Sequence, residues 1–178
     1  MIIGCGAEGD VLAAAGLLKQ IAGQINVVIH AVGILLCLPN ILQAGETIQY
    51  VSLGAGNTGR KFDLETDKRI AEFKFIHWRG GPEAIRQNAL FKDFYSLAEH
   101  STSKSKHLYV LGTEYPLKFF TSRRSISSVL NRHVGLREEF RQKFGDRYQT
   151  VRDYYRAREE FVAIEDVSQW LPNLLASL

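Results

Sequence analysis

Cysteine, proline and long uninterrupted apolar runs are all scarce in this chain of 178 residues. Its two cysteines, Cys5 and Cys37, are too few for a disulfide framework or a four-cysteine zinc site, so a reduced, cytoplasmic setting is expected. Four prolines and fifteen glycines without a biased tract exclude a fibrous or disordered chain. The length predicts one domain over residues 1–178 with a hydrophobic core.

The most apolar stretch, residues 25–38, is shorter than the roughly twenty residues that a membrane-spanning helix needs, and it contains His30. A signal peptide begins with basic residues, whereas the first lysine here is Lys19. The sequence therefore predicts a buried core helix, with no anchor and no membrane partner.

Positive charge is concentrated in one part of the chain. Residues 123–158 carry ten basic and four acidic side chains, a net charge of +6, although the whole chain carries only +3. Such a segment suggests a surface that faces a polyanion, and solvated faces of amphipathic helices explain it equally well.

Hydrophobic periodicity and turn residues predict an α/β fold with a mixed central sheet flanked by helices. A helical C-terminal extension covers about residues 114–178 in several pieces. The preceding elements are expected to be helices at 10–22, 26–42 and 83–100, and strands at 47–53, 61–66, 69–76 and 107–111.

Two glycine patterns of the form G-x-G-x-x-G occur, at residues 4–9 and 54–59. Such a pattern indicates dinucleotide binding only when a strand precedes it and a helix follows. Only three residues precede the first pattern, and the second continues into another strand pattern. Both are therefore interpreted as turns.

Residues 61–75 predict a β-hairpin that carries two facing carboxylates. With a two-residue connection at 67–68, Asp63 lies directly opposite Glu72. Side-chain alternation places Asp63, Glu72 and Lys74 on one face of the hairpin. The other face is apolar and consists of Phe62, Leu64, Ala71, Phe73 and Phe75.

Opposed side chains in such a pair have Cβ atoms about 4.5–5.5 Å apart, so two carboxylates repel unless a cation lies between them. Oxygen ligands with room for water suit Mg²⁺ or Mn²⁺. Lys74 could orient a metal-bound water or neutralise charge on a phosphoryl group. Alternatively, Asp63, Glu65, Glu72 and Lys74 form an exposed, salt-bridged strand face with no chemistry.

The pattern of Asp63, eight residues and then Glu72-Phe73-Lys74 resembles the motif of the PD-(D/E)XK nuclease superfamily, which has the restriction-endonuclease-like fold. The predicted elements between about residues 26 and 111 are similar in order to the αβββαβ core of that family. The resemblance implies that Asp63, Glu72 and the backbone carbonyl of Phe73 bind Mg²⁺. It also implies that Lys74 is the catalytic third member.

The resemblance departs from the family pattern at three places. Phe62 stands where the motif has proline, and Gln87 is followed four residues later by Phe91 where several branches have tyrosine. Many members also carry an acid on the first core helix, but residues 26–42 contain none. The upstream candidates for completing the metal site are Glu8, Asp10, Glu46 and the non-acidic His30.

Several side chains outside the hairpin are candidates for nucleic-acid contact. Trp78 could stack on a base, although packing in a loop or core is its commoner role. Basic and amide side chains that follow the hairpin or precede a helix could contact phosphates. These candidates are Arg79, Arg86, Gln87, Arg123 and Arg124.

Together these features predict a Mg²⁺- or Mn²⁺-dependent nuclease that hydrolyses phosphodiester bonds, with DNA as the expected substrate and a homodimer as one possible assembly. One alternative is a nuclease-fold module that binds nucleic acid with little activity. Another is an interaction protein, unrelated to nucleic acid, in which the hairpin is structural.

Overall fold

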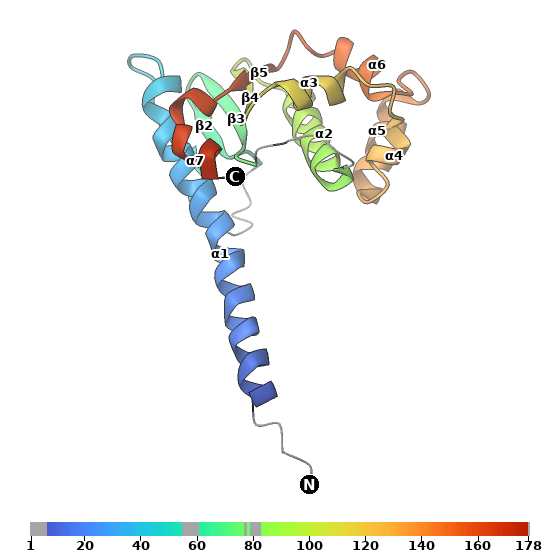
Figure 1. Ribbon diagram of the computed structural model, residues 1–178. Coiled ribbons are helices and arrows are strands. Elements are labelled where there is room, and N and C mark those ends of the chain that lie inside the picture. Colours follow the sequence, from blue (N-terminus) through green and yellow to red (C-terminus); the bar gives the residue numbers. More distant parts are fainter. Residues whose placement is uncertain (1–6, 55–60, 77, 79–82, 178) are drawn as a thin grey trace.

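Figure 1 shows the computed structural model of the chain, which describes residues 7–54, 61–76, 78 and 83–177. A five-stranded mixed sheet is flanked by helices, so the predicted α/β class is confirmed. One long helix extends from the sheet, and most of the shorter helices gather on the opposite side of the molecule. Arg79, nearly all of the second glycine pattern and half of the first lie outside the described residues.

The first helix, α1 (Ala7–Ile41), is continuous where the sequence predicted two helices. The expected break around residues 23–25 contains one glycine and no proline, and a single glycine costs a helix only about 1 kcal/mol. Pro39 lies within the last turn, and the helix ends two residues after it.

The burial of α1 also differs from the prediction of a core helix. Its N-terminal part projects away from the sheet. Over Val11–Ile41 the helix is long and apolar enough to cross a membrane, by length and composition alone. The prediction that the longest apolar stretch covers only residues 25–38 was wrong. Lys19 and the nearby glutamines interrupt the apolar character without ending the helix. The buried large side chains of α1 are Ile34, Cys37, Leu38 and Ile41.

The sheet has the strand order β1-β2-β3-β4-β5, so β3 is its central strand. The pairs β1·β2 and β2·β3 are antiparallel, whereas β3·β4 and β4·β5 are parallel. Leu64 pairs with Ala71, which confirms the predicted register and the two-residue connection of the hairpin. The strands are β1 (Ile48–Val51), β2 (Leu64–Thr66), β3 (Arg69–Lys74), β4 (Ser105–Val110) and β5 (Ala163–Asp166).

Two details of the strands differ from the prediction. β2 begins only at Leu64, so residues 61–63 form a bend, and Phe62 packs on the opposite side of the sheet from Leu64 and Phe73. β5 was missed, because its four residues carry two acids and follow a charged segment. It pairs with β4 and interrupts the extension that was expected to be wholly helical.

Each face of the sheet has its own apolar cluster. Leu64, Ala71 and Phe73 pack with the end of α1 on one face. Ile70, Leu108 and Val110 pack with the helical half of the chain on the other. The helices of that half are α2 (Ala84–Ala98), α3 (Glu114–Phe120), α4 (Ile126–Val129), α5 (Val134–Phe144) and α6 (Val151–Arg156). Two further helices end the chain, η1 (Ser168–Trp170) and α7 (Pro172–Ser177).

Candidate functional site

The hairpin carboxylates lie at the place where β3 contacts both α1 and α2. Glu72 and Lys74 occupy alternate positions on β3. Ala71 and Phe73 occupy the other positions, and their side chains belong to the apolar cluster under α1. The strand therefore turns its two charged side chains toward the side of the sheet that α2 covers. Asp63 comes from the bend immediately before β2.

Asp63 is held by two donors from different elements. The backbone N–H of Phe73 donates a hydrogen bond to Asp63 Oδ2 at 3.0 Å. His30 Nε2, on α1, lies 3.2 Å from Asp63 Oδ1. Burial alone would raise the pKa of Asp63, but these contacts and the charge of Lys74 lower it below its ordinary value. Asp63 is consequently an ionised, oriented carboxylate.

Glu72 is a buried carboxyl group in a negatively charged surrounding. Only 11% of its side chain is exposed, and Asp63 and Asp93 lie near it. Burial, followed by the negative charges of Asp93 and Asp63, raises the pKa of Glu72 to about 9. Its side chain also shares a hydrogen bond with Asp63. Glu72 therefore carries a proton at neutral pH unless a cation replaces it.

Lys74 supplies positive charge to this cluster. Its Nζ lies 2.7 Å from Asp93 Oδ2 and 3.9 Å from Glu72 Oε2. Burial alone would lower the pKa of Lys74, but the neighbouring carboxylates raise it above its ordinary value. The ammonium group is therefore charged and held between β3 and α2.

Asp93 of α2 was not among the residues that the sequence singled out. It lies three residues after Leu90 and four before Leu97, both of which are buried. An acid at that spacing falls on the apolar face of an amphipathic helix, and this signal could have identified it. Burial raises the pKa of Asp93 although Lys74 opposes the shift.

Of the upstream candidates whose side chains the structure describes, His30 and Glu46, only His30 reaches the site. Glu46 instead forms a two-pronged pair with Arg69, whose Nε lies 2.6 Å from Glu46 Oε1, and it also accepts a hydrogen bond from Thr66. The first turns of α1, which hold Glu8 and Asp10, lie at the end of the helix far from the sheet. Glu46 and the first turns of α1 therefore belong to other parts of the fold than Asp63 and Glu72.

The interpretation of an exposed strand face does not fit the structure either. Asp63, Glu72 and Asp93 expose only 18%, 11% and 13% of their side chains. Glu65, which was grouped with them, points elsewhere and pairs with Lys104 at 2.9 Å. The charged face is thus enclosed between two helices.

The predicted nucleic-acid contacts have diverse environments. Trp78 is buried against Tyr115 and Phe119, which is the core packing named above as its commoner role. Gln87 and Arg124 are hydrogen-bonded to each other, which brings α2 and the start of α4 together. Arg86 pairs with Glu83 at 2.6 Å and Arg123 is exposed, while Arg79 lies outside the described residues.

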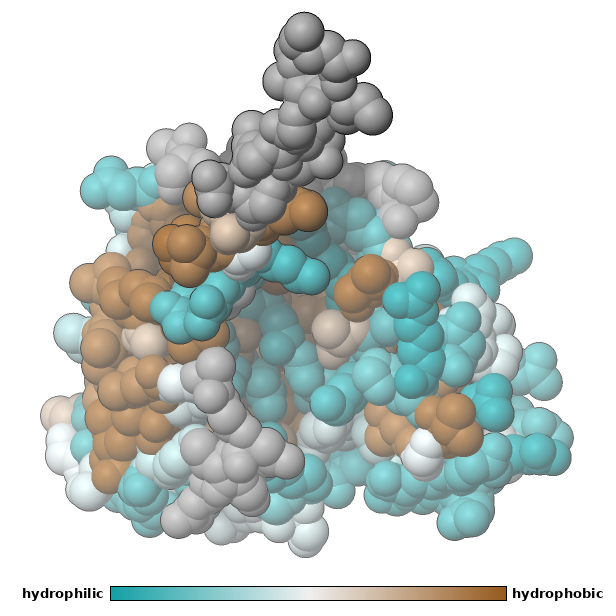
Figure 2. All heavy atoms as spheres, turned by 90° about the horizontal axis from the view of Figure 1, so that it is seen from below, coloured by the Kyte–Doolittle hydropathy of each residue, from teal (hydrophilic) through white to brown (hydrophobic). Residues whose placement is uncertain are grey.

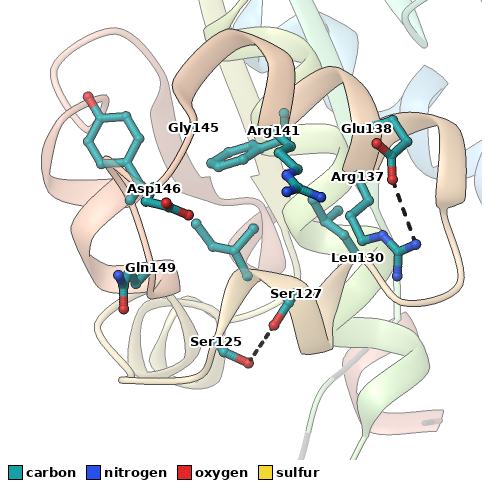
Figure 3. A pocket seen from close by; sticks show the side chains of 12 residues that line it. Ser125, Ser127, Leu130, Arg137, Glu138, Arg141, Gly145, Asp146 and Gln149 are labelled. Atoms are coloured by element: carbon teal, nitrogen blue, oxygen red, sulfur yellow. Dashed lines mark hydrogen bonds and ion pairs between the residues drawn. The ribbon is translucent and has the colours of Figure 1, made fainter.

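A larger hollow lies away from the carboxylates, on the far side of α2. Figure 3 shows this pocket of about 550 Å³ between α4, α5 and the segment after α5. Arg137 and Arg141 line it, and Arg137 lies 3.8 Å from Glu138. A smaller, apolar cavity of about 130 Å³ adjoins Lys74 and Trp78. The charged cluster is therefore separate from the hollow between α4 and α5.

The cluster around Glu72 fits a divalent cation by its charge and by its donor atoms. Three carboxyl groups face one lysine, so ionisation of all three would leave an excess of negative charge in a mostly buried place. Asp63 and Glu72 offer only oxygen atoms, which suit Mg²⁺ or Mn²⁺. Among the described residues, no group of three or more His, Cys, Asp or Glu side chains is arranged to hold a metal ion. The described residues therefore offer two carboxylates, Asp63 and Glu72, and a bound ion would need further oxygen ligands.

No family model, curated protein or solved structure matches this chain.

Proposed function

We propose that the protein is a Mg²⁺- or Mn²⁺-dependent nuclease of the PD-(D/E)XK type. The order α1-β1-β2-β3-α2-β4 supports this proposal, since it repeats the αβββαβ order of the restriction-endonuclease-like core. The register of the hairpin supports it further, because Asp63 and Glu72 come from adjacent positions at its open end.

The observation that carries the proposal is the pKa of Glu72, which is raised to about 9 by burial and by two neighbouring acids. Burying this much like charge is costly, and an inert site would gain stability by replacing it with neutral side chains. Such an arrangement is typical of a site that binds a cation or transfers protons.

Each residue has a role that follows from its contacts. Asp63 and Glu72 would hold the metal ion, and the carbonyl of Phe73 would add a third oxygen if the family pattern applies. The metal ion, when bound, would lower the pKa of water and polarise a phosphoryl oxygen. Lys74, fixed by Asp93, would orient the attacking water and neutralise charge on the phosphate. His30 would keep Asp63 oriented.

Nucleic acid would be bound largely through backbone phosphates. The helical half contributes the net positive charge of residues 123–158, and Arg123 is exposed at its start. Arg124 and Gln87 hold each other and would present their remaining donors together. No base-reading side chain is proposed, and DNA is the substrate to test first.

Cleavage assays with matched variants test this function. Supercoiled plasmid, linear duplex, single-stranded DNA and RNA would each be incubated with Mg²⁺, Mn²⁺ or EDTA. We expect metal-dependent cleavage that falls at least about 100-fold in Asp63→Asn, Glu72→Gln and Lys74→Met. Glu65→Gln, on the same hairpin but paired with Lys104, is the control and should retain activity.

Other outcomes of these assays would select the alternatives. Binding of nucleic acid without cleavage of any substrate would indicate a nuclease-fold binding module. Absence of both binding and cleavage would leave an interaction protein with a structural hairpin. Cleavage that survives Glu72→Gln would contradict the proposed site.

Binding of the metal can be measured independently of cleavage. Because Glu72 is protonated at neutral pH, a metal ion that it binds must displace about one proton. Titration calorimetry with Mn²⁺ in buffers of different ionisation enthalpy reports the number of protons released. We expect about one for the unaltered chain and for Glu65→Gln, and no resolved binding for Glu72→Gln. Binding without proton release would contradict this role of Glu72.

A further inference from the structure

The outer face of α1 carries a regular apolar pattern. Figure 2 looks at the molecule from below the view of Figure 1 and shows hydrophobic side chains gathered on the side where α1 lies. Eight apolar residues of α1 follow each other at alternating steps of three and four residues, and all eight are exposed. We call them the heptad face. They are Val11, Ala14, Leu18, Ile21, Ile25, Val28, Val32 and Leu35.

We propose that the heptad face pairs with the heptad face of a second copy of this chain. Apolar residues at every step of a three-four repeat over four heptads are typical of helices that wrap around each other. The seven large side chains expose between 46% and 68% of their surface, so the part of the chain that the structure describes leaves this face largely uncovered. The proposal does not depend on the nuclease function.

The opposite side of α1 is the one that contacts the rest of the chain. Ile34 and Cys37 are fully buried against the sheet, and the ring of Phe75 lies against the backbone of Gly33. His30 on that side reaches Asp63. The heptad face therefore remains exposed among the described residues, including Val32 and Leu35 where the helix already rests on the sheet. Pairing would leave in place the contacts of Ile34, Cys37 and His30 on the opposite side.

The positions that flank the heptad face favour an identical partner. In paired helices these positions set partner choice through charge. Between Val11 and Leu36 the only charged residue of α1 is Lys19, which lies next to Leu18 and outside the flanking positions. Among the residues whose side chains the structure describes, those at flanking positions are Ala15, Leu17, Gln24, Ile29, Ala31 and Leu36. Two copies of this face meet without repulsion between like charges.

A membrane is the other partner that a long apolar helix could have. A bilayer cannot enclose the end of α1 from His30 onward, because that part is fixed to the sheet and to Asp63. The remaining residues, 11–29, would span about 28 Å, which is close to the hydrocarbon thickness. They include one lysine and three amide side chains, however, and these are costly in a bilayer. Lys19, Gln20 and Asn26 lie away from the heptad face and would stay in water in a paired helix, while Gln24 would lie at its edge.

Sedimentation velocity of the full chain at micromolar concentration tests the proposal. We expect one discrete species with twice the mass of a single chain, which is 20.1 kDa. The double variant Ile21→Asp/Val28→Asp, which places charge on the heptad face, should sediment as a monomer under the same conditions. The matched control Leu12→Asp/Gln20→Asp adds the same charge to exposed positions outside the face and should remain associated.

Folding and membrane binding are followed in parallel. Both variants should keep the far-ultraviolet circular dichroism of the unaltered chain, because all four positions lie on the exposed part of α1. A monomeric unaltered chain, a polydisperse series of aggregates, or equal loss of association in both double variants would overturn the proposal. Flotation of the unaltered chain with phosphatidylcholine–phosphatidylglycerol vesicles, without self-association in their absence, would overturn it in favour of a membrane.

Discussion

At the scale of single residues, the stability of the metal-free protein should depend on Glu72 in a defined pH interval. The pKa of Glu72 is about 9 in the folded protein and about 4.3 in an unfolded chain. The folded state therefore keeps a proton that the unfolded state has lost between these values. The stabilisation due to this proton is complete below about pH 4 and is lost as the pH rises through 9.

The variant Glu72→Gln, which cannot ionise, should be more stable than the unaltered chain at pH 8 by at least about 2 kcal/mol and equally stable at pH 4. Urea unfolding in EDTA at the two pH values measures this difference. The control Glu65→Gln removes an ion pair with Lys104 and should show no gain at pH 8. A gain of the same size at both pH values would mean that packing, and not protonation, is responsible.

At the same scale, the sequence indicated some residues of the site and missed one. Asp63, Glu72 and Lys74 belong to one hairpin, so alternation and a two-residue connection suffice to bring them together. Asp93 arrives on α2, and its position depends on how that helix rotates against the sheet. His30 was placed among the candidates, but its contact with Asp63 depends on the packing of α1.

At the scale of elements, the packing of α1 against the sheet depends on the absence of a side chain at Gly33. A Cβ atom at Gly33 would lie 2.8–2.9 Å from three atoms of the Phe75 ring. That ring is buried and stacked on Phe73, so it has little room to move. Because His30 is one turn away from Gly33, the same contact positions the donor to Asp63.

Gly33→Ala should therefore destabilise the protein by about 1 kcal/mol, since overpacking outweighs the gain in helix propensity. Gly16→Ala is the matched control, because nothing lies within 4 Å of the added methyl group. It should leave the unfolding midpoint unchanged or raise it. Thermal unfolding of both variants measures the difference, and equal midpoints would show that Phe75 moves aside without cost.

The sequence predicted well those elements whose structure is determined by the local sequence pattern. It predicted poorly those elements whose structure is determined by tertiary contacts. The register of β2 and β3 follows from the sequence because their connection has only two residues. β5 is short and acidic, and it is a strand because β4 offers it a parallel edge. The continuity of α1 was missed, since polar residues in its middle are tolerated on the side away from the heptad face.

At the scale of the whole molecule, positive charge is separated from the carboxylate site by α2. Residues 123–158 form the helices on the far side of α2, while Glu72 lies between α2 and the sheet. A phosphate backbone that reaches Lys74 would therefore pass the edge near Gln87 and Arg124. Arg123, exposed at this edge, should contribute one phosphate contact.

Arg123→Ala should weaken binding to DNA of any sequence and reduce the slope of log K against log salt by about 1. Lys19→Ala, which removes the only basic residue of α1, should leave the slope unchanged. Fluorescence anisotropy of a labelled duplex over a range of salt concentrations measures both slopes. Equal slopes in the two variants would place the DNA elsewhere on the protein.

Phe73 belongs to two environments at once. Its ring lies in the cluster under α1, whereas its backbone N–H donates to Asp63. We therefore expect a change in the Phe73 ring to displace the backbone N–H of Phe73 and, through it, to disturb the Asp63 carboxylate. Phe73→Leu should shift the titration of Asp63, which nuclear magnetic resonance can follow. The shift should be larger than in the control Leu111→Ala, which alters the same apolar cluster. Selection for packing and selection for chemistry would thus act on the same codon.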